Sequence, residues 1–158
     1  GTQRPTARSW KYSMRQDEFR ASVHELMQRY IRLLDQERFD EWLTLFDDGG
    51  YYAVLRDIEY RDEDNVLLIG EDMRRLSARI ESGKTRDKRR RTHVVCWEDP
   101  SAECMSAVVG FMVWLDGRPS SCGRYELSFK DDGAALKIGS CTAVLDTIDI
   151  QDTIYLPI

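Results

Sequence analysis

Apolar residues recur every three or four positions through residues 14–36, and charged residues lie between them. This spacing places the apolar side chains on one face of a long helix. The preceding "SMRQ" has the form of a capping box, with Ser13 as N-cap and Gln16 bonding back to it. The pattern therefore predicts an amphipathic helix that packs one face on a core.

Shorter segments follow. A second apolar pattern predicts a helix over 38–46, and "DDGG" at 47–50 is expected to end it, since glycine readily adopts the left-handed backbone. "YYAVLRD" at 51–57 has the composition of a strand. The polar stretch 57–65 is expected to be a loop, and "EDMRRLSARIES" predicts a third helix over 71–82.

From residue 92 onward the period is two residues. After "THVVCWED", the runs 104–115, 122–130 and 134–146 are separated by turn-forming "DGRPS" and "DDG". These runs predict an antiparallel meander. Helices followed by strands are typical of an α+β fold, here with three N-terminal helices packed on one side of a curved antiparallel sheet.

The predicted strands differ in their two faces. The run 122–130 alternates apolar and polar residues, which predicts one buried and one wet face. The run 104–115 is apolar on both, because Val108, Met112 and Trp114 share the face that should be polar. That second face needs a cover. A second subunit or a sheet that folds over itself would supply one, and the pattern leaves both open.

Composition sets the broad class. The chain has 158 residues, which fits a single domain over 13–158 after an aperiodic arm at 1–12. A net charge of −5 argues against a general nucleic-acid binder. No apolar run approaches the roughly 18 residues of a membrane span. The four cysteines form no Cys-x-x-Cys pair, so reduced thiols in a cytoplasmic protein are expected.

Candidate chemistry is sparse. "SGKT" at 82–85 resembles the end of a phosphate-binding loop, but Ala78 stands where that loop needs glycine. The basic segment 84–91 is interpreted as a solvated loop, with phosphate binding or contact to an acidic partner as alternatives. His24 lies at the edge of the first apolar stripe. His93 lies at the start of a strand. There, a structural, hydrogen-bonded histidine in the wall of the core is favoured over a general base.

One stretch resembles a known family. "LLDQERFDEWLTLFDDGGYYAVL" at 33–55 is similar to the N-terminal part of the small (β) subunits of Rieske non-heme iron aromatic-ring-hydroxylating dioxygenases. "GEDMRRLSARIES", "RRRTHVVCW" and "AVLDTIDIQDTIYLPI" extend the resemblance from about residue 19 to the last residue. A shorter meander between 120 and 136 and a more basic loop at 84–91 depart from the family pattern. The final "DTIYLPI" looks most like subunits paired with oxygenases for aromatic carboxylates.

The resemblance implies a cone-shaped fold of the nuclear transport factor 2 (NTF2-like, cystatin-like) type. It implies a mainly structural subunit that forms a trimer and joins a large subunit, three of each, in the catabolism of an aromatic compound. The Rieske 2Fe-2S cluster and the mononuclear iron then belong to the large subunit. The histidine count agrees: the two centres need four histidines, and this chain has two. No catalytic, cofactor-binding or metal residue is expected in it.

A free-standing dehydratase, isomerase or cyclase of the same fold is the competing hypothesis. In that case His93 would be the general base in the cone, with Tyr51 or Tyr52 and Trp42 positioning the substrate. A plain ligand-binding or dimerising module is a third class, since fold does not fix function.

Overall fold

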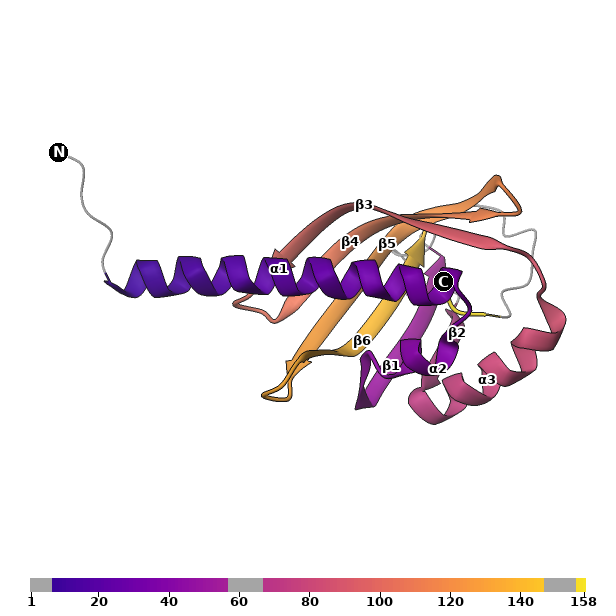
Figure 1. Cartoon of the computed structure of the whole chain (residues 1–158), viewed down its shortest axis with the longest axis horizontal. Coiled ribbons are helices and arrows are strands. Elements are labelled where there is room, and N and C mark those ends of the chain that lie inside the picture. Colours follow the sequence, from indigo (N-terminus) through magenta and orange to yellow (C-terminus); the bar gives the residue numbers. More distant parts are fainter. Residues whose placement is uncertain (1–6, 57–66, 147–155) are drawn as a thin grey trace.

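The computed structural model describes residues 7–56, 67–146 and 156–158. Its elements are α1 (Ala7–Asp35), α2 (Phe39–Leu43), β1 (Phe46–Arg56), β2 (Leu67–Asp72), α3 (Met73–Arg86), β3 (Arg91–Ser101), β4 (Ser106–Leu115), β5 (Arg118–Asp131) and β6 (Leu136–Leu145). Six strands form one curved sheet in the order β2-β1-β6-β5-β4-β3, and α1 lies across it (Figure 1). The predicted α+β fold is confirmed. The expected loop at 57–65 lies outside the described residues.

The sheet is mixed rather than wholly antiparallel. Strands β3 to β6 form the predicted antiparallel meander, and β1 pairs antiparallel with β2. However, β1 runs parallel to β6, with Tyr52 opposite Cys141. After β1, the chain passes through β2 and α3 to the opposite edge of the sheet, where β3 begins. The meander then leads back strand by strand, and its last strand, β6, lies beside β1 and runs in the same direction.

Helix α1 starts earlier than predicted. It begins at Ala7, so residues 7–12, expected as part of a loose arm, are helical, and Ser13 lies inside the helix rather than at its N-cap. No glycine or proline interrupts residues 7–35, so nothing in the sequence stops the helix at Ser13. Gln16 has a different role: its Nε2 donates to Pro100 O (3.0 Å) and its Oε1 accepts from Ala102 N (2.8 Å). These bonds fasten α1 to the end of β3.

The boundaries of the two shorter helices also differ from the predictions. Helix α2 ends at Leu43, and "DDGG" lies inside β1 instead of ending the helix. Gly50 is needed there for space, because a Cβ at this position would be 2.8 Å from Asp47 O where the β1–β6 register shifts. Helix α3 begins after β2, with Asp72 as N-cap accepting a bond from Arg75 N (2.9 Å).

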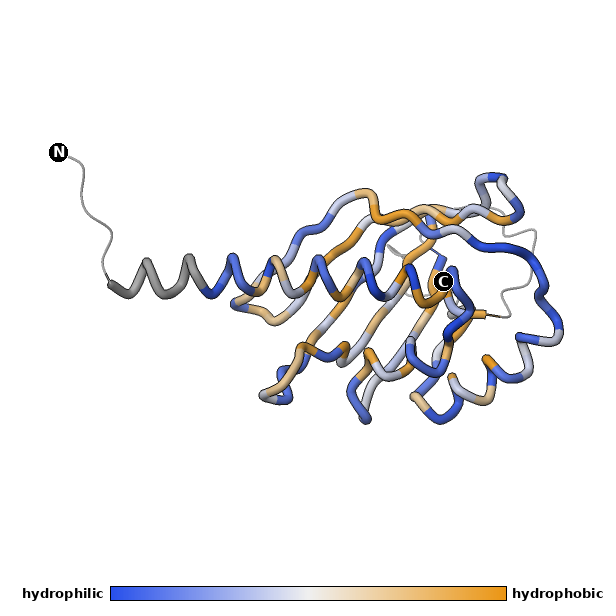
Figure 2. Tube along the Cα trace, in the orientation of Figure 1, coloured by the Kyte–Doolittle hydropathy of each residue, from blue (hydrophilic) through white to orange (hydrophobic). Residues whose placement is uncertain are grey.

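The core lies between α1 and the inner face of the sheet. Buried residues of α1 meet alternate buried residues of β4, β5 and β6. Figure 2 shows hydrophobic stretches alternating with pale and hydrophilic ones along the strands, whereas the run from the end of α3 into β3 is largely hydrophilic. The main members are Phe19, Val23, Met27, Tyr30, Leu33, Trp42, Tyr52, Val109, Phe111, Tyr125, Leu127 and Ile138.

The outer face of the sheet is apolar around β3 and β4. Trp97 pairs with Gly110, and its indole lies against that glycine, where a Cβ would be 2.1 Å from Nε1. Trp97 is 50% exposed and Val94 41% exposed. Met112, opposite Val94, is half-buried. Trp97 therefore covers part of the second apolar face of β4, but its own side chain is half exposed.

Candidate functional site

The C-terminal end of α1 meets the start of β3 through a carboxylate and an imidazole. Both oxygens of Asp35 accept from the backbone N–H of His93 (3.0 and 3.1 Å), and Asp35 Oδ1 lies 2.7 Å from His93 Nδ1. The His93 side chain is fully buried. Because a carboxylate only accepts, Nδ1 carries the hydrogen of this bond. Its Nε2 is buried with no hydrogen-bond partner among the described residues.

Two tyrosine hydroxyls hold the last described segment, 156–158, in the interior. Tyr30 Oη donates to Ile158 O (2.9 Å), and Tyr52 Oη donates to the same oxygen (3.0 Å) while accepting from Ile158 N (2.8 Å). Leu156 and Ile158 are buried. Burial raises the pKa of both tyrosines, so both stay neutral donors. The hydroxyls that could orient a ligand are already used by the chain itself.

Aromatic rings fill the space around this contact. The Trp42 ring lies edge-on to Tyr30 and Tyr52, with centroids 5.4 and 5.7 Å apart, and Tyr125 stacks on Phe111 at 4.1 Å. Within the described part of the chain, Trp42 Nε1 and Tyr125 Oη have no hydrogen-bond partner. Burial raises the pKa of Tyr125, and the negative charge of Asp35 adds to that shift. The interior is therefore a packed aromatic core with a few unpaired polar atoms.

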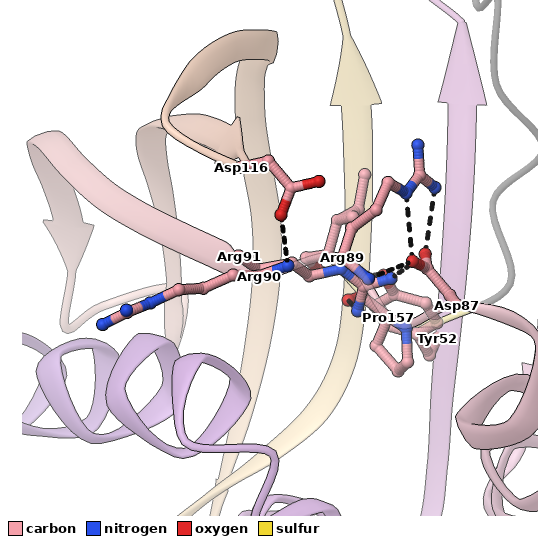
Figure 3. Close-up of polar contacts among 8 residues, drawn as sticks. Tyr52, Asp87, Arg89, Arg90, Arg91, Asp116 and Pro157 are labelled. Carbon is pink, nitrogen blue, oxygen red and sulfur yellow. Dashed lines mark hydrogen bonds and ion pairs between the residues drawn. The ribbon is translucent and has the colours of Figure 1, made fainter.

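An ion-pair cluster closes the same end of the core (Figure 3). Asp87 accepts bonds from Arg89 Nε (3.0 Å) and Arg91 Nη2 (2.8 Å). Arg91 also donates to Pro157 O (3.4 Å), next to the segment held by the tyrosines. The hydrogen bond from Arg89 is the main cause that lowers the pKa of Asp87 to about 2. Arg91 is buried, which corrects the expectation that all the basic residues of 84–91 lie at the surface.

The residues of the competing hypothesis are only partly brought together. Trp42 and Tyr52 are in contact, whereas His93 bonds to Asp35. Tyr51 is excluded from the interior, because it lies on the outer face and is 42% exposed. His24 is the surface residue expected, with Nδ1 2.8 Å from Glu98 Oε2.

Sequence reasoning missed three members of this region. Asp35 is the last residue of "LLD" at 33–35, a predicted helix end, and nothing in the neighbouring sequence indicates that a buried histidine is its partner. The helical spacing predicts only a buried apolar position for Tyr30, although its hydroxyl bonds to Ile158 O. The alternation of 122–130 likewise predicts only a buried strand position for Tyr125. The partners of Tyr30 and Asp35, which are Ile158 and His93, lie 128 and 58 positions away in the chain, so local spacing gives no signal for these contacts.

The described residues contain neither a metal-ligand cluster nor a membrane-spanning helix. Across residues 7–56, 67–146 and 156–158, no group of three or more histidine, cysteine, aspartate or glutamate side chains is placed to hold a metal ion. Within the same ranges, no helix has the length and apolar character needed to cross a membrane.

No family model matches the chain, and no curated protein sequence is recognisably similar to it. Solved structures are similar. The beta subunit of an aromatic-ring-hydroxylating dioxygenase, as it is named, from Novosphingobium aromaticivorans aligns with a TM-score of 0.78 and 23% identity, over 87% of this chain and 95% of that one. The beta subunit of benzoate 1,2-dioxygenase from Burkholderia mallei aligns with a TM-score of 0.66 and 21% identity, over 87% and 96%.

A third structure, named as a scytalone dehydratase from Novosphingobium aromaticivorans, aligns with a TM-score of 0.63 and 12% identity, over 85% of this chain and 89% of that one. Another neighbour is named an NTF2-like protein with a cystatin-like fold. The chain has the NTF2-like fold. At these identities the likeness shows the fold alone, and the same fold carries both dioxygenase subunits and a dehydratase among its neighbours.

Proposed function

We propose that this chain is the small, mainly structural subunit of a multicomponent aromatic-ring-hydroxylating dioxygenase. The observation that carries the proposal is the occupied interior. Ile158 takes the hydroxyls of Tyr30 and Tyr52, and the rings of Trp42 and Tyr125 pack around them. A catalytic cavity needs polar groups that are free to orient a substrate, and these two hydroxyls are already bonded within the chain. The two dioxygenase subunits among the similar structures support the same choice.

The outer face supports an assembly role. Trp97 is half-exposed yet fixed, because its ring lies against Gly110. A rigid exposed tryptophan beside apolar neighbours such as Val94 is typical of an interface centre, because little side-chain entropy is lost on binding. The proposal places contacts between copies of this chain on this face and extends to an assembly of three small and three large subunits. The Rieske cluster and the mononuclear iron are then held by the large subunit, which oxidises an aromatic compound, here proposed to be an aromatic carboxylate.

The basic segment supplies charge for docking. Lys88 and Arg90 are exposed, whereas Arg91 and Arg89 are tied to Asp87. In this proposal the exposed pair steers the large subunit, which would affect association rate and salt dependence more than final affinity.

Co-expression with a large oxygenase subunit tests the proposal. The pair should co-purify as one complex and hydroxylate an aromatic carboxylate when a reductase supplies electrons. The chain purified alone should contain no iron and oxidise nothing. Failure of the two chains to co-purify under any salt condition would contradict the proposal.

One observation favours the competing hypothesis of a dehydratase or isomerase. Asp35 fixes His93 so that Nε2, which has no hydrogen-bond partner among the described residues, can accept a proton, as in a general base. Its test is substitution of His93 in the assembled protein, described in the Discussion.

A further inference from the structure

A charged groove lies along α3, away from the aromatic core. Its volume is about 290 Å³, and its lining comes from Glu71 at the end of β2 and from one face of α3. The helical residues are Arg75, Arg79, Ser82, Gly83 and Arg86. Their spacings of three and four place them in one row on the helix surface.

Gly83 lines the middle of the groove and adds no side chain there. Arg79 and Arg86 flank it along the helix, about 10 Å apart at a rise of 1.5 Å per residue. Arg75 lies one turn before Arg79 on the same face of α3, so these two guanidinium groups can reach one ligand. The hydroxyl of Ser82 lies in the same row of lining residues.

The groove carries net positive charge in a chain whose own net charge is −5. Three arginines line it against the single carboxylate of Glu71. Glu71 binds Arg79 (Nε to Oε1, 3.0 Å), which fixes that guanidinium at the lip. The Arg75 guanidinium makes no hydrogen bond or ion pair with any residue in 7–56, 67–146 or 156–158. One preordered and one uncommitted guanidinium thus face the same space.

We propose that this groove binds a compact dianion, either a phosphate group or a small dicarboxylate. Arginine presents planar paired donors that match phosphate and carboxylate oxygens, and two or more such forks favour a doubly charged ligand. The volume, about 290 Å³, lies just below the range for ligand pockets, roughly 300–1,000 Å³, which favours a small molecule over a peptide segment. The site is independent of the proposed role as a subunit.

Calorimetric titration of the full chain tests the site. Inorganic phosphate and succinate are the two probes, each added at constant ionic strength made up with sodium chloride. At least one of them should bind saturably with a stoichiometry of one per chain. Tighter binding of inorganic phosphate would identify the ligand as a phosphate group, and tighter binding of succinate would identify it as a dicarboxylate.

Arg75→Gln should weaken that binding at least about tenfold, because it removes a charge-assisted donor pair. Arg74→Gln is the matched control, since Arg74 is also exposed on α3 but does not line the groove. The control should stay within about twofold of the parent. Both variants keep a good helix former, so circular dichroism should be unchanged.

Three outcomes would overturn the proposal. The first is no saturable binding of either probe. The second is equal weakening by Arg74→Gln and Arg75→Gln, which would indicate general charge attraction. The third is saturable binding of a penta-glutamate peptide that is sensitive to Arg75→Gln and tighter than the binding of phosphate or succinate. That result would make the groove a docking site for an acidic protein segment.

Discussion

Tyr52 and Ile158 are joined by two hydrogen bonds through one hydroxyl. The tyrosine oxygen donates to Ile158 O at 3.0 Å and accepts from Ile158 N at 2.8 Å. Both residues are buried, and they are 106 positions apart in the sequence. This contact fastens the segment 156–158 inside the fold and uses up the polar group that a ligand would need.

Tyr52→Phe should lower the free energy of unfolding by about 1–3 kcal/mol, because it leaves a buried backbone N–H without its partner. Ile158 O keeps the bond from Tyr30, which limits the loss. Chemical denaturation measures the change. Tyr51→Phe is the control, since Tyr51 lies exposed on the other face of the same strand, and it should have almost no effect. Equal effects of the two substitutions would contradict the account.

Acid should weaken the cluster around Asp87. The pKa of Asp87 is lowered from 3.8 to about 2 in the fold, so its contribution is fully present above the unfolded value and is lost as pH falls through about 2. This lowering of the pKa of Asp87 corresponds to about 2 kcal/mol of folding free energy. Urea unfolding between pH about 5 and about 2 should show the stability difference between the parent and Asp87→Asn shrinking as pH falls.

At neutral pH, Asp87→Asn should be strongly destabilising, by about 3–5 kcal/mol, because it leaves the buried cation of Arg91 without its anion. Asp48→Asn, at an exposed carboxylate, serves as the control and should change little. A pH-independent difference between parent and Asp87→Asn would show that the ion pair is not the source of the stability.

Trp97→Ala should weaken self-association with little effect on folding. The variant removes the exposed half of the ring from the proposed interface, where truncation of a central tryptophan costs about 2 kcal/mol or more of binding free energy. Light scattering across protein concentration should show the parent as an oligomer, expected to be a trimer, and the variant shifted toward monomer. Tyr51→Ala is the control, because Tyr51 is another exposed aromatic residue (42% exposed) on β1 of the same sheet. A parent that is monomeric at micromolar concentration would rule out this interface.

Lys88→Glu with Arg90→Glu should slow association with the large subunit and flatten its dependence on salt. These two side chains are exposed, and the pair leaves Asp87 and its two arginines intact. Stopped-flow or surface-binding kinetics at two salt concentrations give the measurement. An unchanged association rate would remove the basic segment from the docking surface.

The sequence was sufficient for the elements whose hydrophobic period is long and regular. The amphipathic helix, the meander and the buried alternation of Tyr125, Leu127 and Phe129 follow from local spacing, and the structure confirms them. Errors occurred where a distant partner decides the outcome. "DDGG" has the composition of a helix stop, but pairing with β6 draws it into β1.

The candidate site was harder to predict for the same reason. The sequence predicts a hydrogen-bonded His93 at a strand start, but its carboxylate partner lies 58 positions earlier, at the end of α1. Arg91 was assigned to a solvated basic run, because nothing local indicates that Asp87 and Pro157 cover it. Ion pairs and buried hydrogen bonds between distant elements depend on the topology of the sheet, which local sequence patterns do not reveal.

The central claim is that the chain supports catalysis by a partner and performs none itself. The variants that bear on it are His93→Asn and His93→Ala. Asparagine keeps a donor for Asp35 but has no group in place of Nε2, whereas alanine removes both. His93→Ala should cost about 1–3 kcal/mol of stability for the lost buried hydrogen bond, and His93→Asn should recover part of it.

Turnover of the reconstituted oxygenase, measured per assembled complex with each His93 variant, tests the claim most directly. The account predicts that both variants match the parent within about twofold, since no proton passes through this residue. His24→Ala, at the other histidine, should behave in the same way. A loss of about a hundredfold or more in both variants, in complexes that assemble normally, would identify His93 as a general base and contradict the account.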